Sequence, residues 1–79
     1  MKAKVYITYK KAVLDPQGKA VSGALLTMGF KGISDVRVGR LVELELDVSS
    51  KEEARRIIKE MCERLLANPV MEDFSIEVE

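Results

Sequence analysis

The chain has 79 residues, of which 47% are apolar and 33% are charged, and its 13 basic and 13 acidic side chains cancel. This composition is typical of one compact domain, here residues 1–79, and the absence of histidine together with a single cysteine excludes a disulfide and a structural zinc site. No stretch approaches the roughly 18 apolar residues of a membrane span, so we expect a cytoplasmic protein with no membrane contact.

Residues 2–10 alternate between apolar and polar side chains, which predicts a half-buried strand. Asp15 and Pro16 then suit the cap and the first position of a helix. Its apolar stripe consists of Ala20, Val21, Ala24, Leu25 and Met28. Gly18 and Gly23 weaken this helix by roughly 1 kcal/mol each, so we expect packing to stabilise it and another segment to approach its backbone closely.

Two further strands are predicted at residues 36–38 and 42–48, where apolar side chains again alternate with polar ones. Gly39 marks the turn between them. If the valines of both strands are to share a face, the turn must hold an odd number of residues, and 39–41 is the shortest that fits. The sequence therefore predicts a hairpin centred on this glycine.

The clearest helix begins after Ser50, which forms a capping-box pattern with Glu53, and it ends at Asn68 and Pro69. Its apolar side chains repeat at helical spacing: Ala54, Ile57, Ile58, Met61, Cys62, Leu65 and Leu66. A last strand alternates over residues 73–79.

The element order βαββαβ in so short a chain predicts an α+β two-layer sandwich of the ferredoxin-like kind. We expect a four-stranded antiparallel sheet in the order 4-1-3-2, with both helices on one face. Residues 1–40 carry a net charge of +6 and residues 41–79 a net charge of −6, and in this order the lysines of the first strand lie between two acidic strands. The halves then neutralise each other, and with Tyr6 as the only outward aromatic we expect no nucleic-acid binding.

The residues needed for catalysis are scarce. There is no histidine to act as a base, no phosphate-binding loop of the Walker type, and Cys62 lies in an apolar stripe, where a buried and inert thiol is the normal finding. We therefore expect no catalytic residue, no bound cofactor and no metal in this chain, and action through another protein chain.

Helix and strand formation alone do not explain the residues of two segments. Residues 10–20 read K-x-x-V-L-D-P-Q-G-x-A, and residues 62–74 read C-E-x-L-L-A-N-P-V-x-E-D-F. Through these two segments the whole chain resembles the PurS family. The first segment resembles the signature of that family, and the second resembles its closing segment. Residues 28–30 resemble its L-G-F turn, with Met28 in place of leucine, which is a volume-conserving change. The family is the small accessory subunit of phosphoribosylformylglycinamidine (FGAM) synthase.

The resemblance implies a non-catalytic subunit in the fourth step of de novo purine biosynthesis. In this family a glutaminase subunit (PurQ-like) releases ammonia, and a synthetase subunit (small PurL-like) uses ATP and magnesium to convert formylglycinamide ribonucleotide (FGAR) to FGAM. The small subunit, as a homodimer or a higher homo-oligomer, connects the two.

The predicted partner contacts lie in these segments and in the stretch between them: Asp15, Pro16, Gln17, Gly18, Arg37, Gly39, Arg40, Asn68 and Pro69. The predicted dimer contacts are Asp35, Val36 and Arg37. Pairing two copies of the predicted 36–38 strand about a two-fold axis would set Asp35 of one chain opposite Arg37 of the other.

One alternative comes from another class of protein. Asp15 to Gly18, at a strand-to-helix junction, also resembles the D-x-P-G turn of ACT domains, which share the βαββαβ order and bind amino acids as regulatory modules. Residues 68–74 are not part of that pattern, and a chain of this length carries no enzyme to regulate.

Overall fold

The computed structural model describes all 79 residues and contains one three-stranded antiparallel sheet and two α-helices. In chain order the elements are β1 (Lys2–Tyr9), α1 (Pro16–Thr27), β2 (Arg40–Glu45), α2 (Lys51–Met61), a single turn of π-helix, η1 (Cys62–Leu66), and β3 (Glu72–Val78). The sheet order is β2-β1-β3. The α+β class is confirmed, whereas the four-stranded sheet is wrong. Neither helix is long and apolar enough to cross a membrane.

The charge pairing predicted for the sheet is confirmed by its register. Lys2 lies opposite Glu45, and Lys4 lies between Glu43 of β2 and Glu77 of β3. The hydroxyl of Tyr6 donates a hydrogen bond to Glu77 Oε2 at 3.0 Å, which also joins β1 to β3. Each opposite-charge pair stabilises the sheet by a few tenths of a kcal/mol, so the basic and acidic halves of the sequence meet within one fold.

The core lies between the other face of the sheet and α2. The helix begins as predicted, because Ser50 Oγ accepts a hydrogen bond from the Glu53 amide at 3.2 Å. Its apolar stripe then packs against the inward side chains of β1 and β3. The buried apolar residues are Ala3, Val5, Ile7, Ala54, Ile58, Cys62, Ala67 and Val78. All of them come from the sheet, α2, η1 and the residue after it.

Cys62 is completely buried in this core, so we expect its replacement by alanine to cost about 1 kcal/mol in free energy of unfolding through lost packing. Chemical denaturation should measure that loss. Leu65→Ala is the matched control, because Leu65 follows three residues later and is 82% exposed. We expect its effect to stay within about 0.5 kcal/mol. Equal effects of the two substitutions would contradict the assignment of Cys62 to the core.

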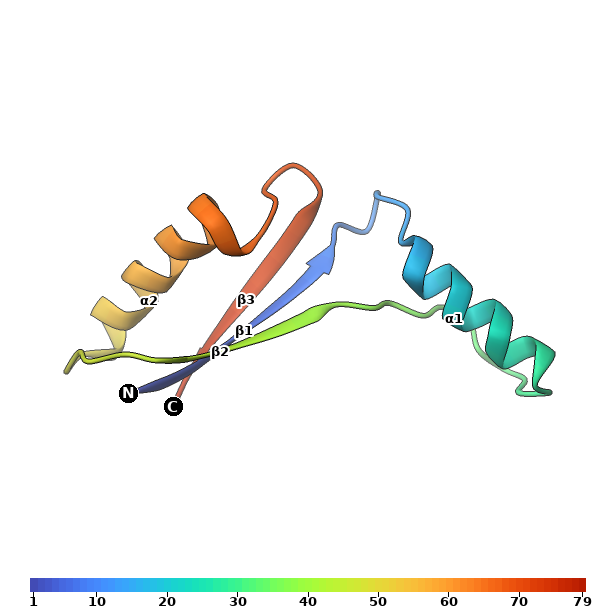
Figure 1. Cartoon of the computed structure of the whole chain (residues 1–79), viewed down its shortest axis with the longest axis horizontal. Coiled ribbons are helices and arrows are strands. Elements are labelled where there is room, and N and C mark those ends of the chain that lie inside the picture. The colour runs from blue at the N-terminus through green and yellow to red at the C-terminus, as the bar shows by residue number, and fades with distance from the viewer.

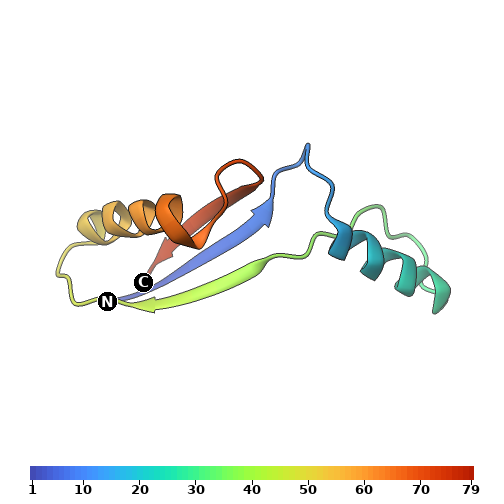
Figure 2. The ribbon, with the colours of Figure 1, turned by 45° about the horizontal axis from the view of Figure 1, so that its top comes forward.

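Helix α1 does not lie on the sheet, which corrects the prediction of two helices on one face. It projects from the end of the sheet where β1 finishes, while the two chain termini lie together at the other end (Figures 1 and 2). No apolar side chain of α1 is buried, including those of its predicted stripe. The molecule is consequently long, 49 × 25 × 15 Å, with a radius of gyration of 15.7 Å. A compact chain of this length would have a radius of gyration of about 12 Å.

The predicted hairpin at Gly39 is also wrong. Residues 28–39 return along α1 and pass straight into β2, so residues 36–38 form no separate strand (Figure 1). Gly39 is required for a different reason. A Cβ placed there would collide with the carbonyl oxygen of Ile7 and lie 2.7 Å from Thr8 Cγ2. The glycine therefore allows the returning chain to approach the end of β1. We call α1 and the connections on either side of it, residues 12–39, the arm.

Candidate functional site

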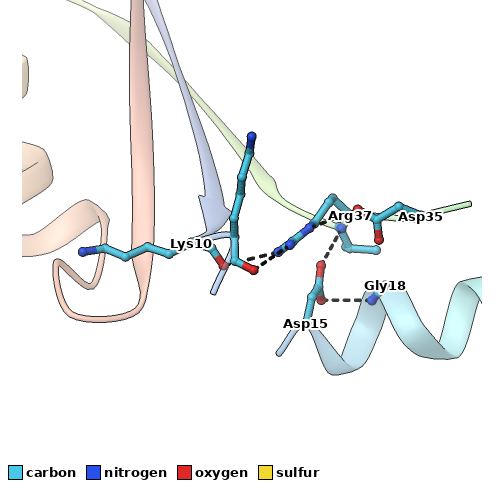
Figure 3. Close-up of polar contacts among 7 residues, drawn as sticks. Lys10, Asp15, Gly18, Asp35 and Arg37 are labelled. Atoms are coloured by element: carbon cyan, nitrogen blue, oxygen red, sulfur yellow. Dashed lines mark hydrogen bonds and ion pairs between the residues drawn. The ribbon is translucent and has the colours of Figure 1, made fainter. Parts of the chain in front are cut away.

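The arm is attached to the sheet through the carboxylate of Asp15, which is only 6% exposed. Its Oδ1 accepts a hydrogen bond from the Gly18 amide at 2.9 Å and thereby caps α1 as predicted. Its Oδ2 accepts one from the Val38 amide, also at 2.9 Å (Figure 3). These two donors lower the pKa of Asp15, so the carboxylate stays charged at neutral pH and its bonds are lost only as the pH falls through that lowered value.

Arg37 fixes the same junction from the other side. Its guanidinium donates to the carbonyl oxygens of Lys10 at 3.4 Å and Lys11 at 3.1 Å, and its Nε lies 3.6 Å from Asp35 Oδ2. Gly18 allows the segments to meet, because a Cβ there would collide with the carbonyl oxygen of Val36. Three parts of the chain are joined in this way, namely the end of β1, the start of α1 and the returning segment. We call Asp15, Gly18, Arg37 and Val38 the arm root.

A second network holds the turn that precedes β3. Arg40 Nη2 donates to Glu72 Oε1 at 2.7 Å and to the carbonyl oxygen of Leu66 at 3.2 Å. The same carboxylate oxygen accepts a hydrogen bond from the backbone amide of Asn68 at 2.8 Å. The side-chain oxygen Oδ1 of Asn68 in turn accepts one from the backbone amide of Val70 at 3.0 Å. The turn around Asn68 and Pro69 is therefore fastened to the beginning of β2.

A cleft of about 500 Å³ lies at the end of the sheet, lined by Val38 of the arm root, the first residues of α1, the end of β1, the start of β2 and this turn. Five of the nine predicted partner contacts line it: Pro16, Gln17, Gly39, Arg40 and Asn68. Three more, Asp15, Gly18 and Arg37, belong to the arm root, and Pro69 is exposed beside Asn68. Residues that are far apart in the sequence are thus brought together at one place.

Sequence reasoning missed five residues that line the cleft: Ile7, Tyr9, Val38, Met71 and Glu72. Glu72 could have been predicted as a site residue, because it belongs to the closing segment that resembles the family. The predicted dimer contacts Asp35, Val36 and Arg37 line a separate cleft of about 540 Å³ together with Lys11 and Lys19. Asp15 and Gly18 line this cleft too, so three of the predicted partner contacts, these two and Arg37, lie beside the predicted dimer contacts.

The chemistry of the cleft suits recognition. It offers the side-chain amides of Gln17 and Asn68, the partly exposed guanidinium of Arg40 and the ring of Tyr9, all held by a rigid hydrogen-bonded frame. Cys62 lies in the core, where burial, with a smaller effect of the Glu63 charge, raises the pKa of its thiol. A raised pKa keeps the thiol protonated and a poor nucleophile.

Comparison with known proteins gives a consistent result. Residues 2–79 match the family described as PurS, phosphoribosylformylglycinamidine (FGAM) synthase. The chain is 49% identical over 78 residues to the PurS subunit of this synthase from Bacillus subtilis, which covers 99% of this chain and 92% of that protein. It is 46% identical over 76 residues to the PurS subunit of Archaeoglobus fulgidus, covering 96% and 95% of the two chains.

Solved structures agree over almost the full length. PurS of Methanocaldococcus jannaschii superposes with a TM-score of 0.90 at 37% identity, covering 99% of this chain and 94% of that one. A chain in the structure of PurLQS from Thermotoga maritima superposes with a TM-score of 0.87 at 32% identity, covering 96% and 93%. Because the arm holds about a third of the residues, scores this high require it to project from the sheet in these relatives as well.

Proposed function

The chain belongs to the PurS family of FGAM synthase subunits, and from this membership we propose that it connects the glutaminase and synthetase subunits, so that ammonia from glutamine is used to make FGAM from FGAR. The observation that supports this role most directly is the similarity to a chain solved within PurLQS. The cleft lined by the start of α1 and the Asn68 turn is our proposed contact with a partner subunit. ATP and magnesium are used by the synthetase subunit and not by this chain.

We further propose that the subunit works as a homodimer in the cytoplasm. Its eight-residue apolar core and its extended shape support self-association, because so small a core supplies only about 3–5 kcal/mol of stability. Asp35, Val36 and Arg37 stay predicted dimer contacts, although the edge strand that suggested them is not formed. The ACT-like alternative is disfavoured, since such modules need a four-stranded βαββαβ fold and this sheet has three strands.

Reconstitution tests the connecting role. The purified chain alone should hydrolyse neither glutamine nor ATP, and adding it to the separate glutaminase and synthetase subunits should restore glutamine-dependent FGAM formation. Affinity capture, with and without glutamine and ADP, should retain both subunits. Glutamine hydrolysis by the pure chain that is abolished by alkylation of Cys62 would refute the non-catalytic role. Equal FGAM formation with and without the chain would refute the connecting role.

A further inference from the structure

Strand β3 leaves a row of backbone groups unpaired at one edge of the sheet. The Lys10 amide donates to the Met71 carbonyl oxygen at 2.9 Å, which fixes the ladder between β1 and β3. Because the bonds alternate along an antiparallel strand, residues 73, 75 and 77 bond to β1. No strand lies on the other side of β3. We give the name β3 edge to the N–H and C=O groups that point to that side, those of Phe74, Ile76 and Val78.

The β3 edge lacks the features that normally protect a free edge. Proteins place lysine, proline or a bulge on such a strand, or cover it with another segment. The seven residues of β3 include neither lysine nor proline, and their register with β1 is continuous. Phe74 and Ile76 are only half-buried, so no other part of the chain closes this edge. The edge is therefore a surface on which an extended chain can pair.

The charges beside the β3 edge indicate the chemistry of its partner. On the outward face of the sheet the two lysines of β1, Lys2 and Lys4, lie between two strands that together carry five carboxylates: Glu43, Glu45, Asp73, Glu77 and Glu79. Asp73 lies opposite Thr8 and therefore has no lysine across the ladder. This excess of negative charge favours a partner strand with lysine or arginine at alternate positions.

The same charges exclude a second β3 strand as that partner. Antiparallel pairing of two β3 edges would set the acidic row of one chain, Asp73, Glu77 and Glu79, against the same row of the other, and like charges across a ladder are destabilising. The edge is also continuous with the proposed partner cleft, because β3 begins at Glu72, which lines that cleft. A segment bound in the cleft can continue along β3.

We propose that an extended basic segment of another subunit of FGAM synthase pairs with the β3 edge and adds a fourth strand to the sheet. This inference rests on the proposed connecting function and specifies the surface and the chemistry of one contact. The backbone of the segment bonds to the groups of the β3 edge. Its basic side chains lie on the outward face, beside Asp73 and Glu79, because successive side chains of a strand alternate between the two faces.

Hydrogen exchange at single amides tests the pairing, measured in the isolated chain and in the complex reconstituted with the glutaminase and synthetase subunits. The amides of Phe74 and Ile76 have no partner in the chain, so we expect them to exchange quickly alone and at least about 10-fold more slowly in the complex. Ser75 is the internal control, because its amide faces β1 and should exchange slowly in both states. Repeating the measurement with each subunit separately identifies the one that supplies the segment.

Asp73→Lys tests the charge of the partner segment. Asp73 is exposed and lies opposite Thr8, so the reversal should leave circular dichroism unchanged, but it would repel a basic strand. We expect the affinity for the partner subunit to fall by about 10-fold or more. Glu63→Lys is the matched control, because Glu63 is exposed on η1, away from the edge, and its reversal should change the affinity by less than about twofold.

Equal affinities of these two variants would overturn the basic partner strand. Exchange at Phe74 and Ile76 that is equally fast in the complex, or already slow in the isolated chain, would overturn the pairing with another subunit. In each of these cases the unmodified chain still restores glutamine-dependent FGAM formation, so the connecting function stands. If the unmodified chain does not restore it, the connecting function fails, and this inference fails with it.

Discussion

Replacing Gly18 with alanine is expected to open the arm root and to abolish FGAM formation by the reconstituted complex. The added Cβ would collide with the carbonyl oxygen of Val36 and would lie 2.9 Å from Asp15 Oδ2. Both neighbours already belong to the junction, so neither can move without separating α1 from the returning segment. Overpacking of this kind costs about 1–3 kcal/mol, which predicts roughly 10- to 100-fold faster hydrogen exchange at the Val38 amide.

Gly23→Ala is the matched control for this prediction. Gly23 lies in the same helix, and a Cβ there meets nothing within 4 Å in the protomer. Alanine should therefore stabilise α1 by up to about 1 kcal/mol, with slow exchange at Val38 retained. Val38 exchange as slow in Gly18→Ala as in the parent protein would show that the junction tolerates the extra atom and would contradict its proposed rigidity.

Local chemistry was the part of the fold that could be predicted from the sequence. Asp15 and Ser50 cap helices as expected, because each cap involves atoms only three residues apart. The lysine-bearing strand β1 pairs with the acidic strands β2 and β3 as expected, because any other placement would set like charges opposite one another. Both kinds of inference need little knowledge of the rest of the molecule.

The predicted hairpin at Gly39 was wrong because the alternation of valines that supported it fits two different backbone paths. A three-residue turn keeps the valines on one face, and so does a chain that does not turn at all, because alternation has a period of two. Glycine did not decide between them. Its small size can serve a turn or a close backbone approach, and here it serves the approach to Ile7.

The position of α1 could not be predicted for a different reason. An apolar stripe indicates that a helix is covered but does not say by which chain. For a monomer the obvious cover is its own sheet, and the connection of residues 10–15 is long enough to permit it. The arm root decides otherwise, through a bond between Asp15 and Val38 that joins residues 23 positions apart and leaves no local trace in the sequence.

The resemblance to the family supplied the residues of the candidate site, but only the fold showed how these residues are arranged. Nothing in the spacing of Pro16, Arg40 and Asn68 indicates that they line one cleft. They meet because β1 lies between β2 and β3, which brings the start of β2 and the turn before β3 to the end of the sheet from which the arm projects. Glu72 holds the cleft together, because its carboxylate accepts hydrogen bonds from the guanidinium of Arg40 and from the backbone amide of Asn68.

Asp15→Asn is expected to separate the two functions of this carboxylate, helix capping and attachment of the arm. Asparagine caps helices as well as aspartate does, so its one oxygen can still accept the Gly18 amide and α1 should persist. The second oxygen becomes an NH₂ group, which cannot accept the Val38 amide. We therefore expect unchanged helix content by circular dichroism, about 10-fold or more faster hydrogen exchange at Val38, and a comparable fall in FGAM formation by the complex.

Asp15→Ala serves as the comparison, because it removes the cap and the attachment together and should also reduce the helix signal. The informative result is the asparagine variant, in which the helix is kept and only its direction is released. If that variant keeps both a protected Val38 amide and full FGAM formation, a single acceptor is enough to hold the arm. If Val38 exchanges quickly while FGAM formation is unchanged, the direction of the arm does not matter to the complex, and the arm root is only part of the fold.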